Sequence, residues 1–458
     1  MADQPGVVVI AAPASGSGKT TVATGLMAAL ARRGTPVAPF KIGPDYVDPG
    51  YHALATGRPG RNLDPVLVGP GRIAALVRHG STGARIAVVE GVMGLFDGRV
   101  RDGAGSTAQV AGLLEAPVVL VVDARGQSRS LAALLHGFGG FDPSVRLAGV
   151  VLNRVGGERH AAVLRTACAE VGVPVLGALP RLPALAVPSR HLGLVTAAEH
   201  GAAAAAAVDE MADVVGEHVD LGAVLRLASP LPAGPVWDPA AEVGPPVPGA
   251  PVVAVAGGPA FTFGYAEHTE LLRAAGAEIA VFDPLRAESL PEGTAALVLP
   301  GGFPEEHVAD LGANAPLRAA VQALARSGAP VHAECGGLLY LCRDLAGAPM
   351  CGVLPASAAM TGRLTLGYRD AVAVAASPVF ARGTHVTGHE FHHCTVTPAR
   401  GTTAAWWWEG RTEGFVSRGV HASFLHTHPA GAPLAVARLV ERAATSRPSG
   451  HGALVVGR

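Results

Sequence analysis

The sequence predicts an α/β protein with two domains, each built on a doubly wound, mostly parallel sheet. Short valine-rich runs alternate with helix-forming stretches in both halves of the chain, which favours parallel strands joined by crossover helices. A proline-rich stretch at residues 229–250 separates the halves, because closely spaced prolines interrupt helices and central strands. We therefore expect domains at residues 1–228 and 251–458, joined by a semi-rigid linker.

Composition excludes several classes of protein. The chain has 458 residues, enough for two or three cores, and its formal net charge of −1 gives no electrostatic case for binding nucleic acid or an anionic membrane. Its five cysteines include no CxxC pair, which argues against a disulfide framework or a structural zinc site and favours a reducing compartment. No segment is apolar for long enough to span a bilayer. We expect a cytoplasmic protein.

The first predicted strand, residues 7–11, leads into a glycine-rich loop and then a helix that ends near residue 33. Glycines let backbone N–H groups surround phosphate oxygens, Lys19 adds a positive charge, and Thr20 offers a hydroxyl to Mg²⁺. Pro13 stands where the motif usually has its first glycine. The predicted ATP-binding residues are Ser15, Gly16, Ser17, Gly18, Lys19, Thr20 and Thr21.

Carboxylates follow the next two predicted strands, at the sheet edge where open α/β sheets bind their ligands. Asp45 and Asp48 follow residues 37–41, and Glu90 follows residues 86–89 directly. The predicted Mg²⁺ ligands are Thr20, Asp45 and Glu90. Further candidates for substrate binding or phosphoryl transfer are Asp48, Asp64, Asp97 and Ser106. A turn or a helix cap is the structural alternative for these four residues.

Three further strands are expected in the first half, at residues 117–123, 147–154 and 173–180. Asn153 comes at the end of one of them and is a candidate contact to the nucleobase. Arg190 and His191 follow in a polar loop, where they either bind a carboxylate-rich ligand or are solvated.

In the second half, Cys335 lies between an apolar run and a helix-like segment that begins at Leu338. A strand, a sharp turn and a helix would hold this thiol near the positive end of a helix dipole, which favours the nucleophilic thiolate. The alternative is a small buried thiol of the core. Strands are also expected at residues 252–256, 279–282 and 296–299.

A base and an oxyanion site are available for this cysteine. His426 and His428 lie two residues apart, so on a regular strand both would face the same way. Gly302 follows the strand at 296–299 and Gly336 follows the cysteine, and their backbone N–H groups are the predicted oxyanion hole. His389 and His393 have the spacing of a zinc motif, but their flanking residues predict a strand rather than the required helix. The three tryptophans at residues 406–408 favour packing over a site.

Seven motifs together resemble those of the cobyrinic acid a,c-diamide synthase family, whose aerobic counterpart is hydrogenobyrinic acid a,c-diamide synthase. They are APxSGxGKTT from Ala12, KxGPDYxDP from Lys41, EGVMGLFDG from Glu90, RHLGL from Arg190, AECGG from Ala333, GHEFH from Gly388 and LHxH from Leu425. Of the two late histidines, the resemblance aligns His426 with the catalytic histidine of the family.

The resemblance implies a dethiobiotin-synthetase-like ATP domain followed by a class I, flavodoxin-like glutamine amidotransferase domain. It implies amidation of the a and c acetate carboxylates of a corrinoid, with ATP and Mg²⁺ as cofactors and L-glutamine as nitrogen donor. Cys335 would be the nucleophile and His426 its partner. Related amidotransferases place a glutamate two residues after this histidine, where His428 stands here. No nucleic-acid or membrane partner is expected, and a homodimer is the assembly to test.

Other functions remain open from the sequence. The substrate alternatives are another tetrapyrrole, such as Ni-sirohydrochlorin, or the substrate of cobyric acid synthase. A partitioning or maturation ATPase with a binding-only second domain would usually carry a lysine where Ala14 stands. A cysteine hydrolase that uses no ATP would leave the loop around Lys19 unexplained.

Overall fold

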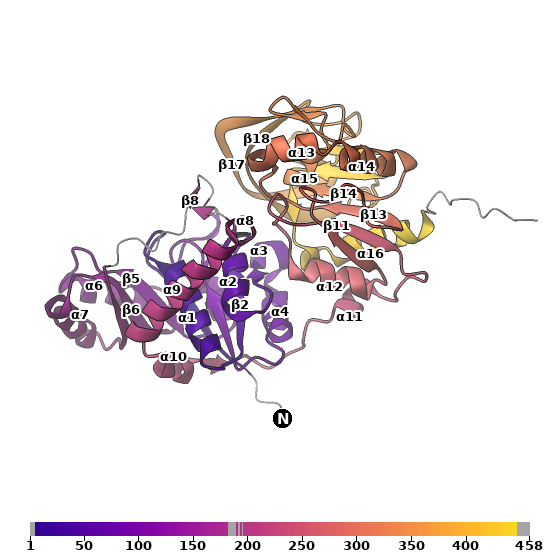
Figure 1. Cartoon of the computed structure of the whole chain (residues 1–458). Coiled ribbons are helices and arrows are strands. Elements are labelled where there is room, and N and C mark those ends of the chain that lie inside the picture. Colours follow the sequence, from indigo (N-terminus) through magenta and orange to yellow (C-terminus); the bar gives the residue numbers. More distant parts are fainter. Residues whose placement is uncertain (1–4, 182–188, 191–192, 195, 447–458) are drawn as a thin grey trace, which may run out of the picture. The chain divides into compact units, whose positions relative to one another are not determined.

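The computed structural model describes residues 5–181, 189–190, 193–194 and 196–446, and the chain forms two compact units, Met1–Trp237 and Asp238–Arg458 (Figure 1). Of the Arg190–His191 pair, His191 and the side chain of Arg190 lie outside the described residues. Within the described parts of the chain, no helix combines the length and the apolar character needed to cross a membrane.

The first unit is built on a sheet in the order β3-β2-β4-β1-β5-β6-β7, whose strands are parallel. The strands are β1 (Gly6–Ala11), β2 (Val37–Ile42), β3 (Arg61–Leu63), β4 (Ile86–Glu90), β5 (Val118–Asp123), β6 (Leu147–Val155) and β7 (Val175–Pro180). The short strand β10 (Ser229–Pro230) pairs with β1 in the antiparallel sense. Strands β1 and β4 lie side by side, so the loop after β1 and Glu90 at the end of β4 meet at one edge.

Helices cover both faces of this sheet, as right-handed crossovers require. Helices α1 (Lys19–Arg32), α2 (Asp48–Thr56) and α9 (Ala202–His218) pack together on one face (Figure 1). The remaining crossover helices are α4 (Ile73–Gly80), α5 (Thr107–Leu113), α6 (Ser130–Gly140) and α7 (Glu158–Glu170); shorter helices are α3 (Pro65–Val68), α8 (Ala197–His200) and α10 (Leu221–Leu227).

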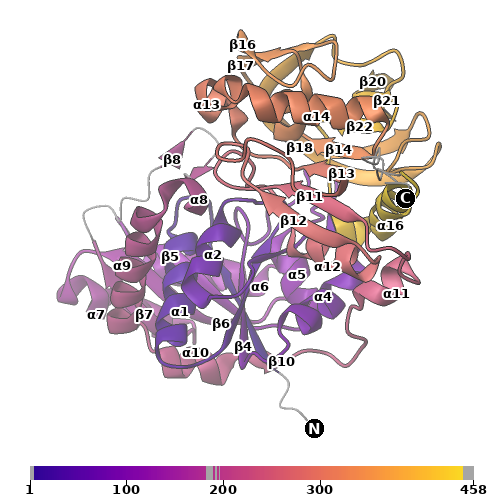
Figure 2. The ribbon, with the colours of Figure 1, turned by 45° about the vertical axis from the view of Figure 1, so that its right-hand side comes forward.

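The second unit has a sheet in the order β12-β11-β13-β14-β22-β21, in which only β21 is antiparallel to its neighbour. The strands are β11 (Val252–Ala256), β12 (Glu278–Phe282), β13 (Thr294–Leu299), β14 (Val331–Glu334), β21 (Phe415–Ser417) and β22 (Val420–Ser423). Helices α12 (Ala266–Ala274) and α16 (Pro433–Thr445) lie on one side of it, and α13 (Val308–Ala313) and α14 (Ala315–Ser327) lie on the other (Figure 2). The α/β fold class predicted for both halves is confirmed.

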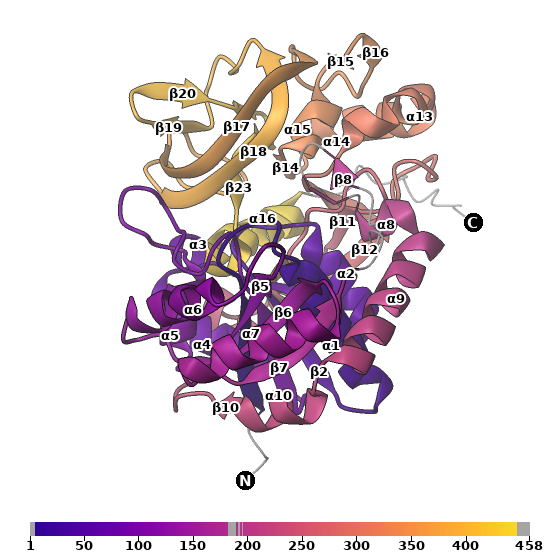
Figure 3. The ribbon, with the colours of Figure 1, turned by 90° about the vertical axis from the view of Figure 1, so that its left-hand side faces the viewer.

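A second, mainly antiparallel sheet in this unit contains a long curved hairpin of β17 (Ser357–Ala373) and β18 (His385–Thr397) (Figure 3). Its smaller strands are β15 (Asp344–Leu345), β16 (Ala348–Pro349), β19 (Trp406–Trp408), β20 (Arg411–Glu413) and β23 (His426–Thr427). The strand predicted around His389 and His393 is therefore β18. Strand β23 pairs with it, placing His389 opposite His426.

The proline-rich stretch contains more structure than a linker was expected to have. Trp237 is buried, its backbone N–H donates to the Ala75 carbonyl at 3.1 Å, and its ring meets His79 edge-on. The following helix α11 (Pro239–Val243) begins at a proline and is capped by the Asp238 side chain. Proline is tolerated there because the first N–H of a helix has no intrahelical partner.

Candidate functional site

The glycine loop after β1 has the conformation that a phosphate-binding loop needs. Gly16 and Gly18 have φ of 79° and 94°, in the left-handed region that favours glycine. A Cβ on Gly18 would lie 2.1 Å from the amide nitrogen of Asn153. Asn153 itself donates to the Ser17 carbonyl at 2.9 Å, so it braces the loop. Lys19 Nζ donates to the Met93 carbonyl at 2.9 Å.

A buried polar cluster lies beside this loop. Thr20 donates its hydroxyl hydrogen to Glu90 Oε1 at 2.6 Å, and the Lys41 ammonium contacts the same oxygen at 2.9 Å. Lys41 also contacts Asp48, and His52 Nε2 lies 2.7 Å from Glu90 Oε2. Sequence reasoning selected Thr20, Asp48 and Glu90 but missed Lys41 and His52. Two features of the sequence could have identified them: Lys41 lies near the end of an apolar strand, and His52 follows Asp48 by four residues, on the same face of a helix.

The charges in this cluster shift one another strongly. Burial favours the neutral amine of Lys41, but Asp48 and Glu90 outweigh it and hold the pKa of Lys41 above its usual range. Burial opposes ionisation of Glu90, yet Lys41 and His52 hold the pKa of Glu90 below its usual range. Burial and the charge of Asp45 raise the pKa of Asp48. A proton is therefore held more readily by Asp48 than by Glu90.

The other predicted residues of this unit fall into two groups. Asp45 is closest to the cluster: its Oδ2 lies 3.8 Å from Lys41 Nζ, and its Oδ1 accepts from the N–H groups of Val47 and Asp48. Asp97 Oδ2 accepts from the Gly94 N–H at 3.0 Å in the loop that also receives Lys19. Asp64 and Ser106 are the N-caps of α3 and α5.

Cys335 occupies a strained turn between β14 and α15 (Gly336–Leu341) in the second unit. Its φ of 47° and ψ of −101° are rare for a residue with a side chain, and such strain is typical of a sharply presented functional group. The expectation of a favoured thiolate is wrong for this conformation. Burial, with Cys394 and Glu305, raises the pKa of Cys335 well above its usual range, so the thiol needs a base.

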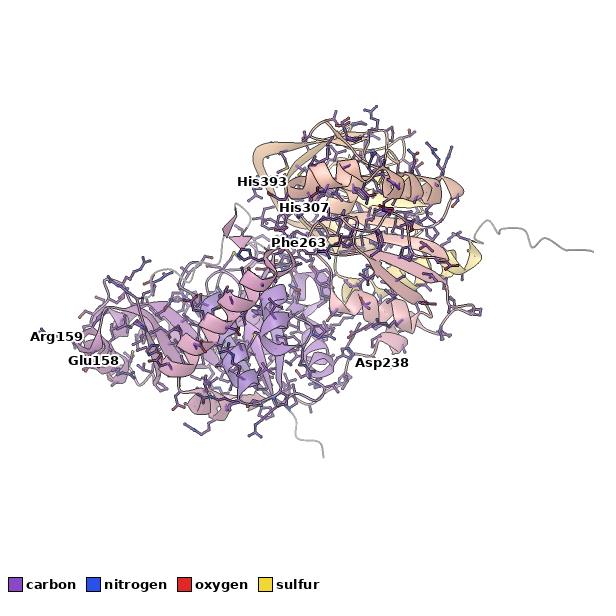
Figure 4. The ribbon with its side chains drawn as sticks, viewed as in Figure 1. Glu158, Arg159, Asp238, Phe263, His307 and His393 are labelled. Carbon is purple, nitrogen blue, oxygen red and sulfur yellow. The ribbon has the colours of Figure 1, made fainter. Side chains whose placement is uncertain are left out.

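Glycine backbones crowd around this turn. A Cβ on Gly336 would lie 2.9 Å from the Gly302 nitrogen, so the two predicted oxyanion-hole residues are close neighbours. A Cβ on Gly301 would lie 2.4 Å from Cε1 of His426. Phe263, marked in Figure 4, donates its N–H to the Gly301 carbonyl at 3.0 Å, and its ring centroid is 6.3 Å from that of His426.

His426 lies on β23 and is almost fully buried. Burial, with His389 and His392, lowers the pKa of His426 to about 3, so its imidazole is neutral near pH 7 and is by itself a weak base. Its Nδ1 lies 3.8 Å from Oε2 of Glu334, the residue that precedes Cys335. His428 instead follows the strand and caps a 3-10 turn, accepting from the Ala430 N–H at 3.2 Å. Sequence reasoning missed Glu334.

Comparison with known proteins places both units in described domain families. Residues 8–195 match the CobQ/CobB/MinD/ParA nucleotide binding domain, and residues 252–433 match the CobB/CobQ-like glutamine amidotransferase domain. The chain is similar to proteins named hydrogenobyrinate a,c-diamide synthase in three organisms. Identity is 59% with the one from Mycobacterium tuberculosis H37Rv, covering 96% of this chain and 98% of the relative. It is 57% for Streptomyces coelicolor, covering 96% and 98%, and 53% for Thermobifida fusca, covering 96% and 97%.

These matches extend over almost the whole chain and include both the glycine loop around Lys19 and the turn at Cys335. The chain is therefore an amidating ligase with a nucleotide-binding domain and a glutamine amidotransferase domain, and it belongs to the hydrogenobyrinate a,c-diamide synthase family.

Proposed function

We propose that this enzyme amidates the a and c acetate carboxylates of hydrogenobyrinate, using ATP and glutamine in the cytoplasm. The observation that carries the proposal is the 59% identity to a protein named for this reaction, over 96% of the chain. It is supported by the buried Lys41–Glu90 cluster beside the glycine loop and by the strained turn at Cys335. Glu334, the residue before Cys335, lies 3.8 Å from the His426 ring. The substrate with cobalt already inserted, cobyrinate, is the nearest alternative.

The first half of the proposed reaction activates the acid. A carboxylate resists attack by ammonia because it is an anion with a poor leaving group. An oxygen of the acetate would attack the γ-phosphorus of ATP, breaking the bond to ADP and forming an acyl phosphate. Lys19 would neutralise charge on the phosphates, and Lys41 would hold Asp48 and Glu90 in place. Ammonia would then attack the acyl carbon, and phosphate would leave with the bonding electrons.

The residues near Thr20 fit a magnesium ion. The Thr20 hydroxyl hydrogen is directed to Glu90, which leaves its oxygen lone pairs for a cation, and Asp45 is only partly buried. Glu90 would act through Thr20, because its two carboxylate oxygens already contact Thr20, Lys41 and His52. Mg²⁺ would supply charge neutralisation of the phosphates. Asn153 would hold the loop in shape, and Asp97 would hold the adjoining loop.

The second half releases ammonia from glutamine. His426 would take the thiol proton of Cys335, and the sulfur would attack the amide carbon, with Gly302 and Gly336 donating N–H groups to the developing oxyanion. The proton would pass to the departing amine, leaving a thioester. Water would then hydrolyse the thioester to glutamate and restore the thiol.

Product analysis tests this proposal directly. The enzyme would be incubated with ATP, Mg²⁺ and glutamine and, in separate reactions, with hydrogenobyrinate, cobyrinate or Ni-sirohydrochlorin. The masses of the products would then be measured by mass spectrometry. Two successive amidations of hydrogenobyrinate are expected. Amidation of Ni-sirohydrochlorin alone would overturn the proposed substrate.

Separate variants test the two halves. Cys335→Ser should lose glutamine-dependent amidation but keep amidation with a high concentration of ammonia. Loss of both reactions in a folded Cys335→Ser protein would contradict separate ammonia-releasing and ammonia-using steps.

A further inference from the structure

Glu334 is a largely buried carboxylate, with 13% of its side chain exposed, in an unusual position. It ends β14 directly before Cys335, and its Oε1 accepts hydrogen bonds from the Thr427 N–H at 3.1 Å and the Thr427 hydroxyl at 2.8 Å. Because Thr427 follows His426, these bonds hold the histidine strand against the cysteine strand. The other carboxylate oxygen, Oε2, lies 3.8 Å from His426 Nδ1. That is within ion-pair distance but longer than a hydrogen bond.

Two residues after His426 the chain has a second histidine, His428, rather than a carboxylate. Its Nδ1 accepts from the Ala430 N–H, and its ring centroid lies 4.1 Å from that of Tyr265. The His428 side chain thus caps a turn and packs on an aromatic ring. Glu334 instead brings a carboxylate oxygen within 4 Å of the His426 ring.

We infer that Glu334 is the positioning residue for His426: it orients the imidazole toward Cys335 and stabilises the imidazolium formed when the thiol is deprotonated. The inference rests on the proposed glutaminase role of Cys335 and His426. A base held by a third group follows the general logic of nucleophile, base and orienter. In this chain the third group comes from the cysteine strand rather than from the histidine strand.

The surroundings explain why such a carboxylate is needed. The side chain of His426 is 1% exposed, and a proton placed on it would face His389 and His392 of β18 across a low-dielectric pocket. The carboxylate of Glu334, 3.8 Å from the ring, offsets that repulsion. Glu334 is itself faced by His332 Nε2, 3.5 Å from Oε1, and Cys335 is faced by Cys394 and Glu305.

Glu334 can respond to the proton that His426 receives. Burial raises the pKa of Glu334 to about 7, although the bonds from Thr427 oppose this. The carboxyl also borders a cavity of about 40 Å³ shared with His268, His332 and Thr427. That volume is sufficient for a water molecule. A positive charge on His426 would therefore favour the ionised carboxylate at the pH where the enzyme works.

Glu334→Gln isolates the charge. Glutamine keeps the side-chain length and an oxygen that accepts from Thr427, but it carries no negative charge. In the full-length enzyme, glutamine-dependent turnover should fall by at least about 10²-fold. This factor is the lower end of the rate enhancement that a well-positioned base contributes. Ammonia-dependent turnover should be unchanged. Glu334→Asp, which keeps the charge at shorter reach, should recover part of the loss.

A second readout separates positioning from a merely structural role. A glutamine analogue carrying an electrophilic diazoketone would label Cys335, and mass spectrometry of its peptide would give the labelling rate as a function of pH. The Glu334 charge has two opposite effects on this profile: it raises the pKa of Cys335 directly, and it stabilises an imidazolium at His426, whose Nδ1 lies 3.8 Å away. If Glu334 acts through His426, the second effect dominates, and loss of the charge should move the rising limb of the profile to higher pH. A purely structural carboxylate would leave the profile in place.

Glu413→Gln is the matched control. Glu413 is another buried carboxylate of the same unit, it accepts from a hydroxyl and a backbone N–H at 2.6 Å and 3.0 Å, and burial likewise raises its pKa to about 7. These two partners are Ser423 and Phe424, neither of which can take up a proton from Cys335.

The charged groups that act on Glu413 are Glu390 and Arg411. If the loss in Glu334→Gln arises through His426, the Glu413→Gln variant should keep glutamine-dependent turnover within about threefold, a change of less than about 1 kcal/mol, and an unshifted profile.

The outcomes are distinct. If Glu334→Gln keeps glutamine-dependent turnover and the labelling profile of the wild type, the positioning inference is wrong. If it loses ammonia-dependent turnover as well, and the aspartate variant shows no recovery, the residue is structural and the inference is also wrong. A Cys335→Ser enzyme that still hydrolyses glutamine would instead overturn the proposed glutaminase site.

Discussion

At the scale of single residues, the first unit depends on charges that compensate one another out of water. Lys41 is 3% exposed and Glu90 is 0% exposed, and each would be unstable alone in that environment. Their pairing restores the charged state of both, together with contacts from Asp48 and His52. The side chains proposed to act near the nucleotide are therefore also expected to contribute to the stability of the unit.

Lys41→Met should destabilise the first unit, because it leaves buried carboxylates without their cation. Removing one partner of a buried pair costs about 3–5 kcal/mol. Calorimetric unfolding of the full chain would measure the loss. Arg129→Ala is the control, since Arg129 pairs with Glu170 on the surface, where a salt bridge contributes only about 0–1 kcal/mol. Equal losses in the two variants would show that Lys41 is not compensating buried charge.

Several of the residues that matter here were beyond prediction from sequence, for a physical reason. The glycine loop at Lys19 and the elbow at Cys335 are local patterns of strand, turn and helix, and both are present as expected. Lys41, His52 and Glu334 depend on neighbours 38 to 93 positions away in sequence. The pKa of Cys335 was also beyond reach, since burial of the turn outweighs the helix dipole there.

At the scale of elements, β14 and β22 place two histidines opposite each other, His332 and His421. Burial lowers the pKa of His421 to about 3, and burial followed by the charge of His421 lowers that of His332. The folded state therefore binds fewer protons than the unfolded state once the pH falls below the ordinary histidine pKa. The stability of this strand pair must fall as the pH falls through that range.

His421→Phe tests this pH dependence. Between about pH 6.5 and pH 4 the wild type should lose roughly 3 kcal/mol through His421 alone, from the shift of its pKa. Phenylalanine cannot be protonated and suits the packing of residue 421 against Phe380 and Trp406. Urea unfolding at several pH values should show a shallower loss in the variant. An unchanged slope would mean that His421 does not contribute to acid sensitivity.

In the loop between β13 and α13, the His426 ring leaves no room for a side chain at Gly301. A methyl group there would lie 2.4 Å from the His426 ring, so Gly301→Ala must displace the ring or the strand that carries it. Glutamine-dependent amidation should fall at least about tenfold while ammonia-dependent amidation is kept, as expected when a base is misplaced by about an ångström.

Gly264→Ala is the control for that change, because a Cβ on Gly264 meets nothing within 4 Å. It should retain both activities. Retention of glutamine use by Gly301→Ala would show that the ring tolerates the displacement. The geometry of the site therefore depends in part on Gly301. This dependence is not evident from the local sequence, because the ring that crowds Gly301 belongs to the distant strand β23.

At the scale of the whole molecule, the proposed mechanism joins two reactions through one intermediate, ammonia. Ammonia released at Cys335 would be nucleophilic only while it is unprotonated, and bulk water near neutral pH protonates most of it. An enzyme that shelters ammonia from water would use the nitrogen of glutamine in preference to ammonium from solution. An enzyme that releases the ammonia into the solvent would instead use glutamine-derived ammonia and dissolved ammonium without distinction.

An isotope competition distinguishes these cases. The full-length enzyme would receive ATP, Mg²⁺, hydrogenobyrinate, unlabelled glutamine and an equal concentration of ¹⁵N-ammonium near neutral pH, and the diamide would be analysed by mass spectrometry. Sheltered transfer predicts a product almost free of ¹⁵N. Cys335→Ser in the same mixture must incorporate ¹⁵N, which proves that the synthetase site accepts external ammonia. A wild-type product that follows the isotope ratio of the solution would show that ammonia equilibrates with water before it reacts.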